Sequence, residues 1–155
     1  MAAGIGGGAG QLLAYRHHAA KYMAVHSLCR VGYFSGVTMA SVLLIEDETL
    51  IRMMMADMLI DLGHTVAAEA GDLSAGLALA QNVDCDAAII DLLLGDEHSD
   101  EIAQVLKSRK IPFAFASGFG AGGVPEQFRD CPVLQKPFPI DALSSCLTKL
   151  LRSVA

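Results

Sequence analysis

Residues 42–47 read Val-Leu-Leu-Ile-Glu-Asp, so a short run of branched apolar residues ends directly on two acids. Four consecutive aliphatic side chains without polar alternation are typical of a strand that is buried on both faces of a parallel sheet. A similar pattern recurs at 87–91, where Ala-Ala-Ile-Ile precedes Asp91, and at 112–117, where Pro-Phe-Ala-Phe-Ala precedes Ser117. We therefore expect several buried strands that each end on a polar residue.

Helix signals alternate with these strands. In the first helix, expected at 49–62, Thr49 is a candidate cap and Gly63 suits the left-handed position that ends a helix. Its expected inward face consists of Ile51, Met54, Met55, Met58 and Leu62. Further helices are expected from Asp72, from Ser99 and over 139–151, and further strands at 65–69, 86–90, 111–116 and 132–135. This alternation predicts an α/β fold, a doubly wound five-stranded parallel sheet covered by helices on both faces.

One interval between strands is poor in helix formers. Residues 118–123 contain four glycines, and each glycine disfavours a helix by roughly 1 kcal/mol relative to alanine. Pro125 can begin a helix but is costly inside one. We expect a long mobile loop here, with at most a short helix near 125–129.

The composition describes a folded acidic domain. Of the 155 residues, 53% are hydrophobic, and residues 41–155 hold all 17 acids with 8 of the 11 basic residues, a net charge of −9. Such a domain lacks the basic footprint that nucleic-acid binding requires. Neither a bilayer-spanning apolar run nor a secretory pattern is evident, so we expect a cytoplasmic protein without membrane contact. The cysteines at 85, 131 and 146 lie in or beside apolar runs and are expected to be reduced.

Residues 1–40 differ from the rest of the chain. They begin Ala- and Gly-rich, contain three basic residues and no acid, and show no sustained helix or strand period. Met39 stands directly before the first predicted strand. The segment is therefore either an extension upstream of the natural start or a genuine flexible arm, and both interpretations stay open. The folded domain is expected at 41–155.

Lys136 follows Val133-Leu-Gln135, at the end of the last predicted strand. In a parallel sheet the carboxyl ends of the strands share one edge, and ligands bind at that edge. Residues far apart in the sequence would then meet in one site that holds three carboxylates, one hydroxyl and one ammonium: Glu46, Asp47, Asp91, Ser117 and Lys136.

These groups suit a magnesium ion and a phosphoryl group. Magnesium prefers oxygen ligands, which Glu46, Asp47, Asp91 and the backbone carbonyl of Leu93 would supply. Asp91, ionised at neutral pH, could attack phosphorus and form an acyl phosphate. Lys136 would neutralise phosphoryl charge, and Ser117 would donate a hydrogen bond to the phosphoryl group. Each residue alone also has an ordinary interpretation in a turn or on the surface, and only their joint placement favours a site.

With these residues in place, the stretch from about 42 to 151 resembles the receiver domain of bacterial two-component response regulators. The resemblance rests on the acidic pair 46–47, on Asp91 after its apolar run, on Ser117, and on Lys136-Pro-Phe138. It implies a flavodoxin-like (βα)5 fold, a cis Lys136–Pro137 bond, and Mg²⁺-dependent phosphoryl transfer to Asp91 from a histidine kinase or histidine phosphotransfer protein. It also implies a monomeric or weakly dimeric phosphoacceptor that catalyses its own phosphorylation and dephosphorylation, not an enzyme with a separate substrate.

Residues 112–120 are similar to a subgroup of single-domain receivers with the motif Phe-Ala-Thr-Gly-aromatic-Gly, with Ser117 in place of the threonine. Because the sequence stops four residues after Leu151, we expect no output domain, and output through a downstream protein target or a phosphate relay or sink. Val133 stands where many receivers have an aromatic residue that turns inward on phosphorylation. We hypothesise that the loop at 118–123, which carries Phe119, does the switching instead.

Three other functions fit parts of this pattern. A degenerate receiver would bind a partner without phosphorylation. A phosphatase of the haloacid dehalogenase type also uses an Asp after a strand, but it places a second Asp two residues on, where this chain has Leu93. A nucleotide-binding Rossmann module fits the sequence less well than these two, because no Gly-x-Gly-x-x-Gly follows the first predicted strand.

Overall fold

The computed structural model describes residues 39–153, so the expectations for 1–38 lie outside the described residues. Five parallel strands form one sheet in the order β2-β1-β3-β6-β7. The prediction of a doubly wound parallel sheet is confirmed, with small shifts at the strand ends. The bounds are β1 Ser41–Ile45, β2 Thr65–Ala70, β3 Ala87–Asp91, β6 Phe113–Ser117 and β7 Val133–Gln135.

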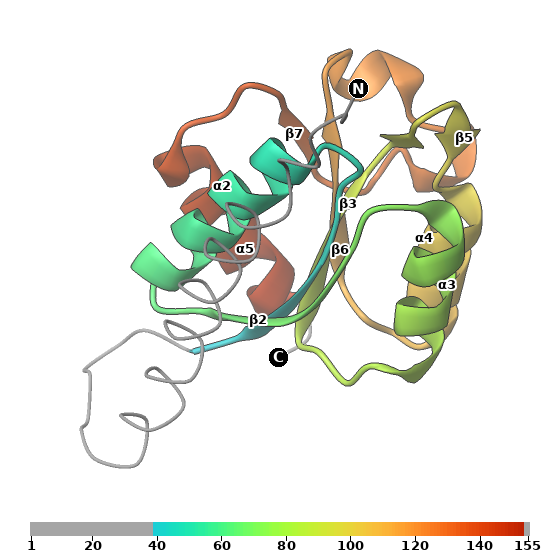
Figure 1. Cartoon of the computed structure of the whole chain (residues 1–155). Coiled ribbons are helices and arrows are strands. Elements are labelled where there is room, and N and C mark those ends of the chain that lie inside the picture. The colour runs from blue at the N-terminus through green and yellow to red at the C-terminus, as the bar shows by residue number, and fades with distance from the viewer. Residues whose placement is uncertain (1–38, 154–155) are drawn as a thin grey trace, which may run out of the picture. The chain divides into compact units, whose positions relative to one another are not determined.

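Helices cover both faces of this sheet (Figure 1). Helices α2 (Thr49–Asp61) and α5 (Ile140–Arg152) pack on one face, and α3 (Leu73–Asn82) and α4 (Asp100–Ser108) pack on the other. Each strand of the sheet interior contributes alternate side chains to two separate cores, so β1, β3 and β6 are buried on both faces. This double burial explains why these strands read as unbroken apolar runs.

Helix α2 corrects two details of the sequence interpretation. Its N-cap is Glu48, whose carbonyl accepts from the Arg52 N–H, so Thr49 is the first helical residue and does not cap the helix. The buried stripe consists of Met55, Ala56 and Leu59, while Met54 is 42% exposed because it lies about 100° around the helix from Met55. The C-terminal signal is confirmed, since Gly63 has a φ of 83°.

A short hairpin after β3 was not expected. Strands β4 (Leu93–Leu94) and β5 (Glu97–His98) pair antiparallel in a segment for which no element was predicted. Gly95 turns the chain with a φ of 63°, which leaves only one further residue between the two strands. Ser99 precedes α4 as expected, but its hydroxyl donates to the Leu92 carbonyl and does not cap the helix. Asp72 does cap α3, by accepting from the Ala75 N–H at 2.8 Å.

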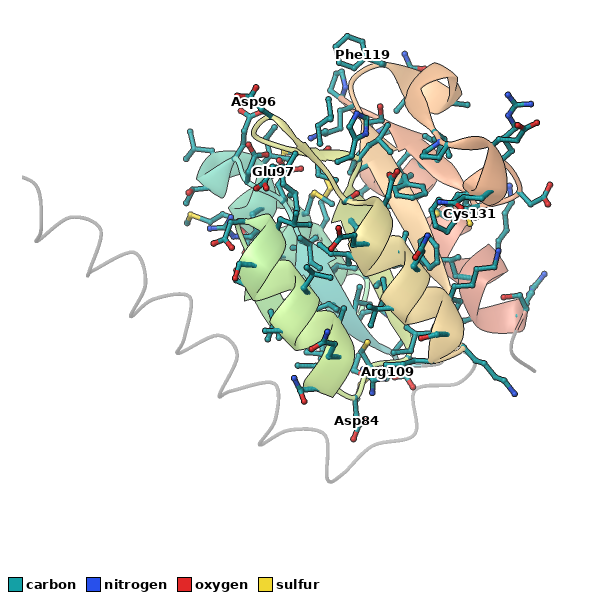
Figure 2. All side chains as sticks on the ribbon, turned by 90° about the vertical axis from the view of Figure 1, so that its right-hand side faces the viewer. Asp84, Asp96, Glu97, Arg109, Phe119 and Cys131 are labelled. Carbon is teal, nitrogen blue, oxygen red and sulfur yellow. The ribbon has the colours of Figure 1, made fainter. Side chains whose placement is uncertain are left out.

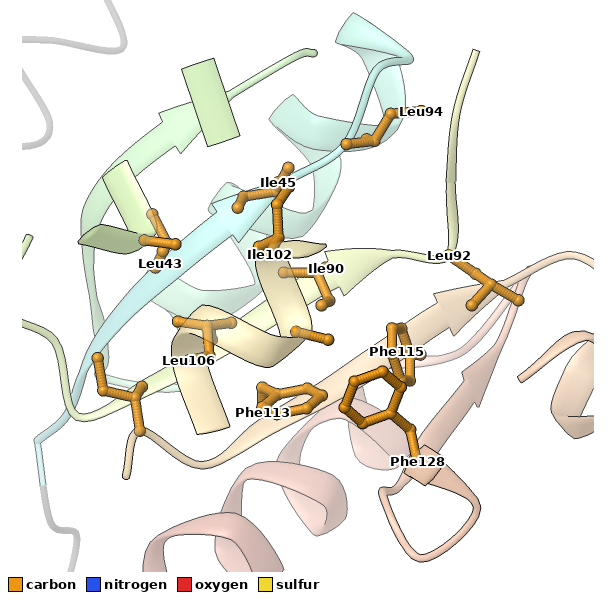
Figure 3. Packing of buried hydrophobic residues seen from close by; sticks show 14 of the residues in the cluster. Leu43, Ile45, Ile90, Leu92, Leu94, Ile102, Leu106, Phe113, Phe115 and Phe128 are labelled. Atoms are coloured by element: carbon orange, nitrogen blue, oxygen red, sulfur yellow. The ribbon is translucent and has the colours of Figure 1, made fainter. Parts of the chain in front are cut away.

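The chain between β6 and β7 forms two 3₁₀ turns, η1 (Gly120–Gly123) and η2 (Glu126–Phe128), in place of a fifth α-helix. The expected short helical turn after Pro125 is confirmed, and η1 is an addition to it. Figure 3 shows how this segment is anchored: the Phe128 ring packs edge-on against Phe113 and Phe115, with centroids 6.0 and 5.8 Å away. Residues 120–123 are glycine and alanine and contribute no ring to this cluster, so the aromatic contacts fix η2 and not η1.

Two further expectations can be compared with residues 39–153. None of their helices is long and apolar enough to cross a membrane. Cys85, Cys131 and Cys146 are free thiols, and burial raises the pKa of each of them.

Candidate functional site

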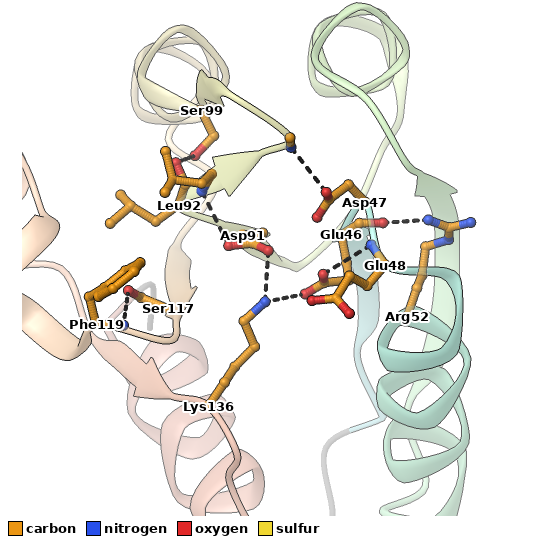
Figure 4. A network of polar contacts seen from close by, with 12 residues as sticks. Glu46, Asp47, Glu48, Arg52, Asp91, Leu92, Ser99, Ser117, Phe119 and Lys136 are labelled. Carbon is orange, nitrogen blue, oxygen red and sulfur yellow. Dashed lines mark hydrogen bonds and ion pairs between the residues drawn. The ribbon is translucent and has the colours of Figure 1, made fainter.

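The structure brings the predicted site residues together at the carboxyl edge of the sheet (Figure 4). Glu46 and Asp47 follow the last residue of β1, and Asp91 is the last residue of β3. Ser117 is the last residue of β6, and Lys136 comes directly after β7. Neighbouring strands are in parallel register, so their ends lie side by side, and four separate segments supply one cluster.

The three acids form a compact oxygen cluster. One carboxylate oxygen from each of Glu46, Asp47 and Asp91 lies within 4.8 Å of the others. Glu46 is fully buried, Asp91 is nearly so, and Asp47 is half-buried. Carboxylates packed this closely repel one another unless a cation or protons compensate their charge, and hard oxygen donors of this kind suit Mg²⁺.

Lys136 supplies part of that compensation. Its ammonium donates to Asp91 Oδ2 at 2.7 Å and to Glu46 Oε2 at 2.8 Å, so it bridges two of the three acids. The peptide bond from Lys136 to Pro137 is cis, as the resemblance implied.

The titration of these groups follows from their surroundings. Burial raises the pKa of Glu46 to about 7, against the lowering effect of the Lys136 hydrogen bond. Burial would lower the pKa of Lys136, but its hydrogen bonds to Asp91 and Glu46 outweigh burial and raise that pKa. Lys136 therefore stays a cation, and the cluster holds more negative charge than one lysine balances.

Backbone N–H groups orient the acids. Asp91 Oδ1 accepts from the Leu93 N–H at 3.2 Å, Asp47 Oδ2 accepts from the Gly95 N–H at 3.0 Å, and Glu46 Oε1 accepts from the Glu48 N–H at 3.2 Å. The hairpin after β3 thus touches two of the three acids. Leu93 lines a cleft together with Asp47 and Asp91. The residue whose backbone carbonyl was expected as a cation ligand therefore lies beside the acidic cluster.

Ser117 and Phe119 form the other side of the site. Ser117 is buried, and its Oγ accepts from the Phe119 N–H at 3.1 Å, which leaves the hydroxyl proton for another acceptor. The Phe119 ring is 78% exposed and projects from the end of the molecule that also carries Asp96 and Glu97 (Figure 2). The cleft has a volume of about 320 Å³, and its lining includes Asp47, Asp91, Leu93, Ser117, Phe119 and Lys136.

Sequence reasoning missed two residues near the site, Arg52 and Gly95. Arg52 donates to the backbone carbonyl of Glu46, and Gly95 offers its N–H to Asp47. Neither contact leaves a clear pattern in the sequence, because one partner in each is a backbone group. A partial signal exists for Arg52, which lies within the first two turns of the helix that follows the acidic pair.

Several solved structures of known proteins are similar to this chain in fold and in sequence. SdrG from Sphingomonas melonis Fr1 is 39% identical, with a TM-score of 0.65 over 75% of this chain and 99% of SdrG. The BeF3-activated conformation of SdrG (Pseudomonas melonis Fr1) is 42% identical, with a TM-score of 0.61 over 72% of this chain and 95% of that one. The response regulator PhyR from Brucella abortus is 26% identical, with a TM-score of 0.63 over 76% of this chain and 49% of PhyR. This chain belongs to the response regulator receiver domains.

A curated relative agrees with this assignment. The transcriptional regulatory protein PdtaR of Mycobacterium tuberculosis is 34% identical over 106 residues, which cover 66% of this chain and 52% of PdtaR. The chain thus spans about half the length of the curated relatives it matches. No family model matches the chain. Receiver domains are signalling proteins of two-component systems and not classical enzymes.

Proposed function

We propose that this receiver accepts a phosphoryl group on Asp91 in a Mg²⁺-dependent reaction. The observation that carries the proposal is the double bridge from Lys136 to Asp91 Oδ2 and Glu46 Oε2, beside a cluster of three acids with carboxylate oxygens within 4.8 Å of one another. A solvated turn of acids would not hold a lysine between two buried carboxylates. A site that holds a cation and a phosphoryl dianion together needs carboxylates for the first and an ammonium for the second close by.

The donor is the phosphohistidine of a histidine kinase or histidine phosphotransfer protein. An Asp91 carboxylate oxygen attacks phosphorus, and a P–O bond forms while the P–N bond to the histidine breaks. The imidazole nitrogen keeps the electron pair of that bond, and Asp91 becomes an acyl phosphate. Acetyl phosphate can replace the protein donor, with acetate as the leaving group.

The cation site consists of Glu46, Asp47, Asp91 and the Leu93 carbonyl. Its donor set fits Mg²⁺, which takes oxygen ligands and few carboxylates. When bound, Mg²⁺ neutralises negative charge on the phosphoryl group and orients it. Lys136 holds the Asp91 carboxylate in position before transfer and then neutralises phosphoryl oxygens, and the Ser117 hydroxyl donates a hydrogen bond to one of them.

Output goes through protein contacts with a downstream target, or the domain serves as a phosphate relay or sink. The exposed Phe119 supports output through contacts. Its N–H donates to Ser117 Oγ, so a phosphoryl group that binds the Ser117 hydroxyl would shift this aromatic ring on the surface. The BeF3-activated conformation of its relative SdrG supports the proposal that this family responds to a phosphoryl mimic. We place the protein in the cytoplasm, where such kinases present their phosphohistidine.

Intact mass after incubation with Mg²⁺ and acetyl phosphate, or with a phosphorylated kinase, tests the proposal. Wild type should gain the mass of one phosphoryl group, and prior addition of a chelator should prevent the gain. Asp91→Asn should gain nothing. Asp96→Asn, at an exposed turn position of the hairpin, removes the same charge near the site and should react like wild type. No adduct on wild type with either donor would favour a receiver that binds its partner without phosphorylation.

A further inference from the structure

Arg52 reaches from α2 to the loop that carries the acidic pair. Its guanidinium donates to the backbone carbonyl of Glu46 (Figure 4). Its Nε also lies 3.7 Å from Glu69 Oε2 on β2. Only 18% of the Arg52 side chain is exposed. The guanidinium therefore lies beside the acidic pair, and its hydrogen bond goes to a backbone oxygen of Glu46 and not to a carboxylate of the cluster.

Gly71 provides the space for this guanidinium. A Cβ built on Gly71 would lie 2.7 Å from Arg52 Nη1, closer than real Cβ contacts permit. The backbone at Gly71 is not in the left-handed region, so its conformation alone would accept alanine. A methyl group at this position would therefore require the end of the Arg52 side chain to move away.

The contact constrains the acidic pair through peptide geometry. The Glu46 carbonyl and the Asp47 N–H belong to one planar peptide group, so holding the oxygen fixes the rotation of the whole plane. That plane sets ψ of Glu46 and φ of Asp47, and hence the directions in which both carboxylates leave the backbone. On its other side Glu46 is held by its N–H, which donates to the Ala70 carbonyl at 3.0 Å. Together with the Arg52 contact to the Glu46 carbonyl, this hydrogen bond holds Glu46 at both of its backbone polar groups.

We propose that Arg52, seated against Gly71, is a positioning residue for the cation site. It acts on the Glu46–Asp47 peptide and not on the ion. The inference rests on the proposed function, because it assigns Mg²⁺ to Glu46, Asp47 and Asp91. Residues that orient metal ligands in this way commonly change metal affinity by about 10- to 100-fold when they are removed.

A second arginine in the same domain serves as a matched control. Arg109 also donates to backbone carbonyls, those of Ala80 at 2.7 Å and Val83 at 2.8 Å, and also pairs with an acid, Asp84. It lies at the opposite end of the domain from Asp96, Glu97 and Phe119 (Figure 2). Arg109→Gln should lower stability as Arg52→Gln does, without changing Mg²⁺ affinity.

Calorimetric titration of Mg²⁺ into wild type, the Arg109→Gln control and four variants at Arg52 and Gly71 tests the proposal. Arg52→Gln should weaken binding by about tenfold. Arg52→Lys should fall between it and wild type, since lysine keeps the positive charge but lacks the planar fork with which the guanidinium reaches its partners. Gly71→Ala should weaken binding by about three- to tenfold, because its methyl group displaces the guanidinium. In the double variant, Gly71→Ala should add nothing to Arg52→Gln, since the displaced group is already gone.

The outcomes separate this inference from the proposed function. Equal Mg²⁺ affinity of Arg52→Gln and wild type would overturn the inference alone, provided that wild type binds Mg²⁺ and forms the phosphoryl adduct. An equal loss from Gly71→Ala in both arginine backgrounds would also overturn it, because the glycine would then act by another route. A wild type that neither binds Mg²⁺ nor forms the adduct would overturn the proposed function and this inference with it.

Discussion

At the scale of single residues, Lys136 has two tasks that a substitution can separate. In the metal-free protein it compensates the charge of Glu46 and Asp91, and in phosphoryl transfer it would bind the transferred group. Lys136→Met should lower the free energy of unfolding of metal-free protein by about 2–3 kcal/mol, because two buried carboxylates lose their cation. Saturating Mg²⁺ should recover part of this loss, since the ion compensates the same charges, whereas the phosphoryl adduct should stay absent.

Urea unfolding in chelator and in Mg²⁺ measures the effect, and intact mass follows the adduct. Lys149→Met, a change at an exposed lysine of α5, is the control and should alter neither quantity. An equal loss of stability with and without Mg²⁺ would contradict the account, because it would show that Lys136 acts by packing and not by charge.

His64 makes a separate prediction about pH. It is buried, its Nδ1 accepts from the Ala40 N–H at 3.3 Å, and burial lowers its pKa below the ordinary value of 6.5. The unfolded chain therefore binds the proton more readily than the folded one, so stability is present above about pH 6.5 and is lost as pH falls below it.

His64→Asn keeps an acceptor near the Nδ1 position but cannot be protonated. The free energy of unfolding of wild type should fall more steeply than that of the variant from about pH 7 to about pH 5.5 in chemical denaturation. His98→Asn removes an exposed histidine and should keep the wild-type slope. Parallel slopes for wild type and His64→Asn would show that carboxylates alone cause the acid dependence.

The residues of the site differ in how well the sequence could predict them. Asp91, Ser117 and Lys136 each follow an apolar run, so the strand pattern gives their position and the parallel sheet brings them together. Arg52 could not be found in this way, because its partners are a backbone carbonyl and the empty space at Gly71. Contacts of that kind depend on the path of the loop, which periodicity does not describe.

At the scale of elements, the segment from Ser117 to Phe128 has two unequal halves. The Phe128 ring fixes η2 to the core, whereas η1 contains three glycines and follows the exposed Phe119. The link to the site is the Phe119 N–H, which donates to Ser117 Oγ. A phosphoryl group that draws the Ser117 hydroxyl toward Asp91 would disturb this contact and re-order the glycine-rich half.

Amide hydrogen exchange with and without beryllofluoride and Mg²⁺ measures this response. We expect altered protection at 118–124 and a smaller change at 126–128, where the aromatic cluster resists movement. Asp91→Asn supplies the control and should show no change. Unaltered exchange across 118–128 in wild type would contradict the hypothesis that this loop replaces the aromatic switch absent at Val133.

The elements also show where sequence patterns reach their limit. The apolar runs predicted β1, β3 and β6, because strands buried on both faces leave an unbroken signal. The edge strands β2 and β7 are only partly buried, so their signals are weaker, although both were predicted. The two-residue strands β4 and β5 were missed, since two residues are too few to show a strand period and only the turn at Gly95 pairs them. Met54 was misplaced because a methionine-rich helix gives three adjacent candidates for one buried stripe.

At the scale of the whole molecule, the fold concentrates negative charge at one edge of its sheet. Residues 41–155 carry a net charge of −9, and three of the acids share one cluster that Lys136 only partly balances. Mg²⁺ bound there would favour the folded state, because only folding brings the ends of β1 and β3 together. The cation should therefore stabilise the entire cooperative unit and not only the loop that binds it.

Thermal unfolding at increasing Mg²⁺ tests this coupling. Ligand binding to the folded state alone contributes about 2.7 kcal/mol when the ligand concentration is a hundred times its dissociation constant. The melting temperature of wild type should therefore rise steadily with Mg²⁺, and that of Asp47→Asn should rise far less because the cluster loses a ligand. Asp96→Asn removes an equal charge outside the cluster and should follow wild type. If all three proteins shifted equally, Mg²⁺ would be screening the net charge of the surface, and the cluster would hold no specific cation.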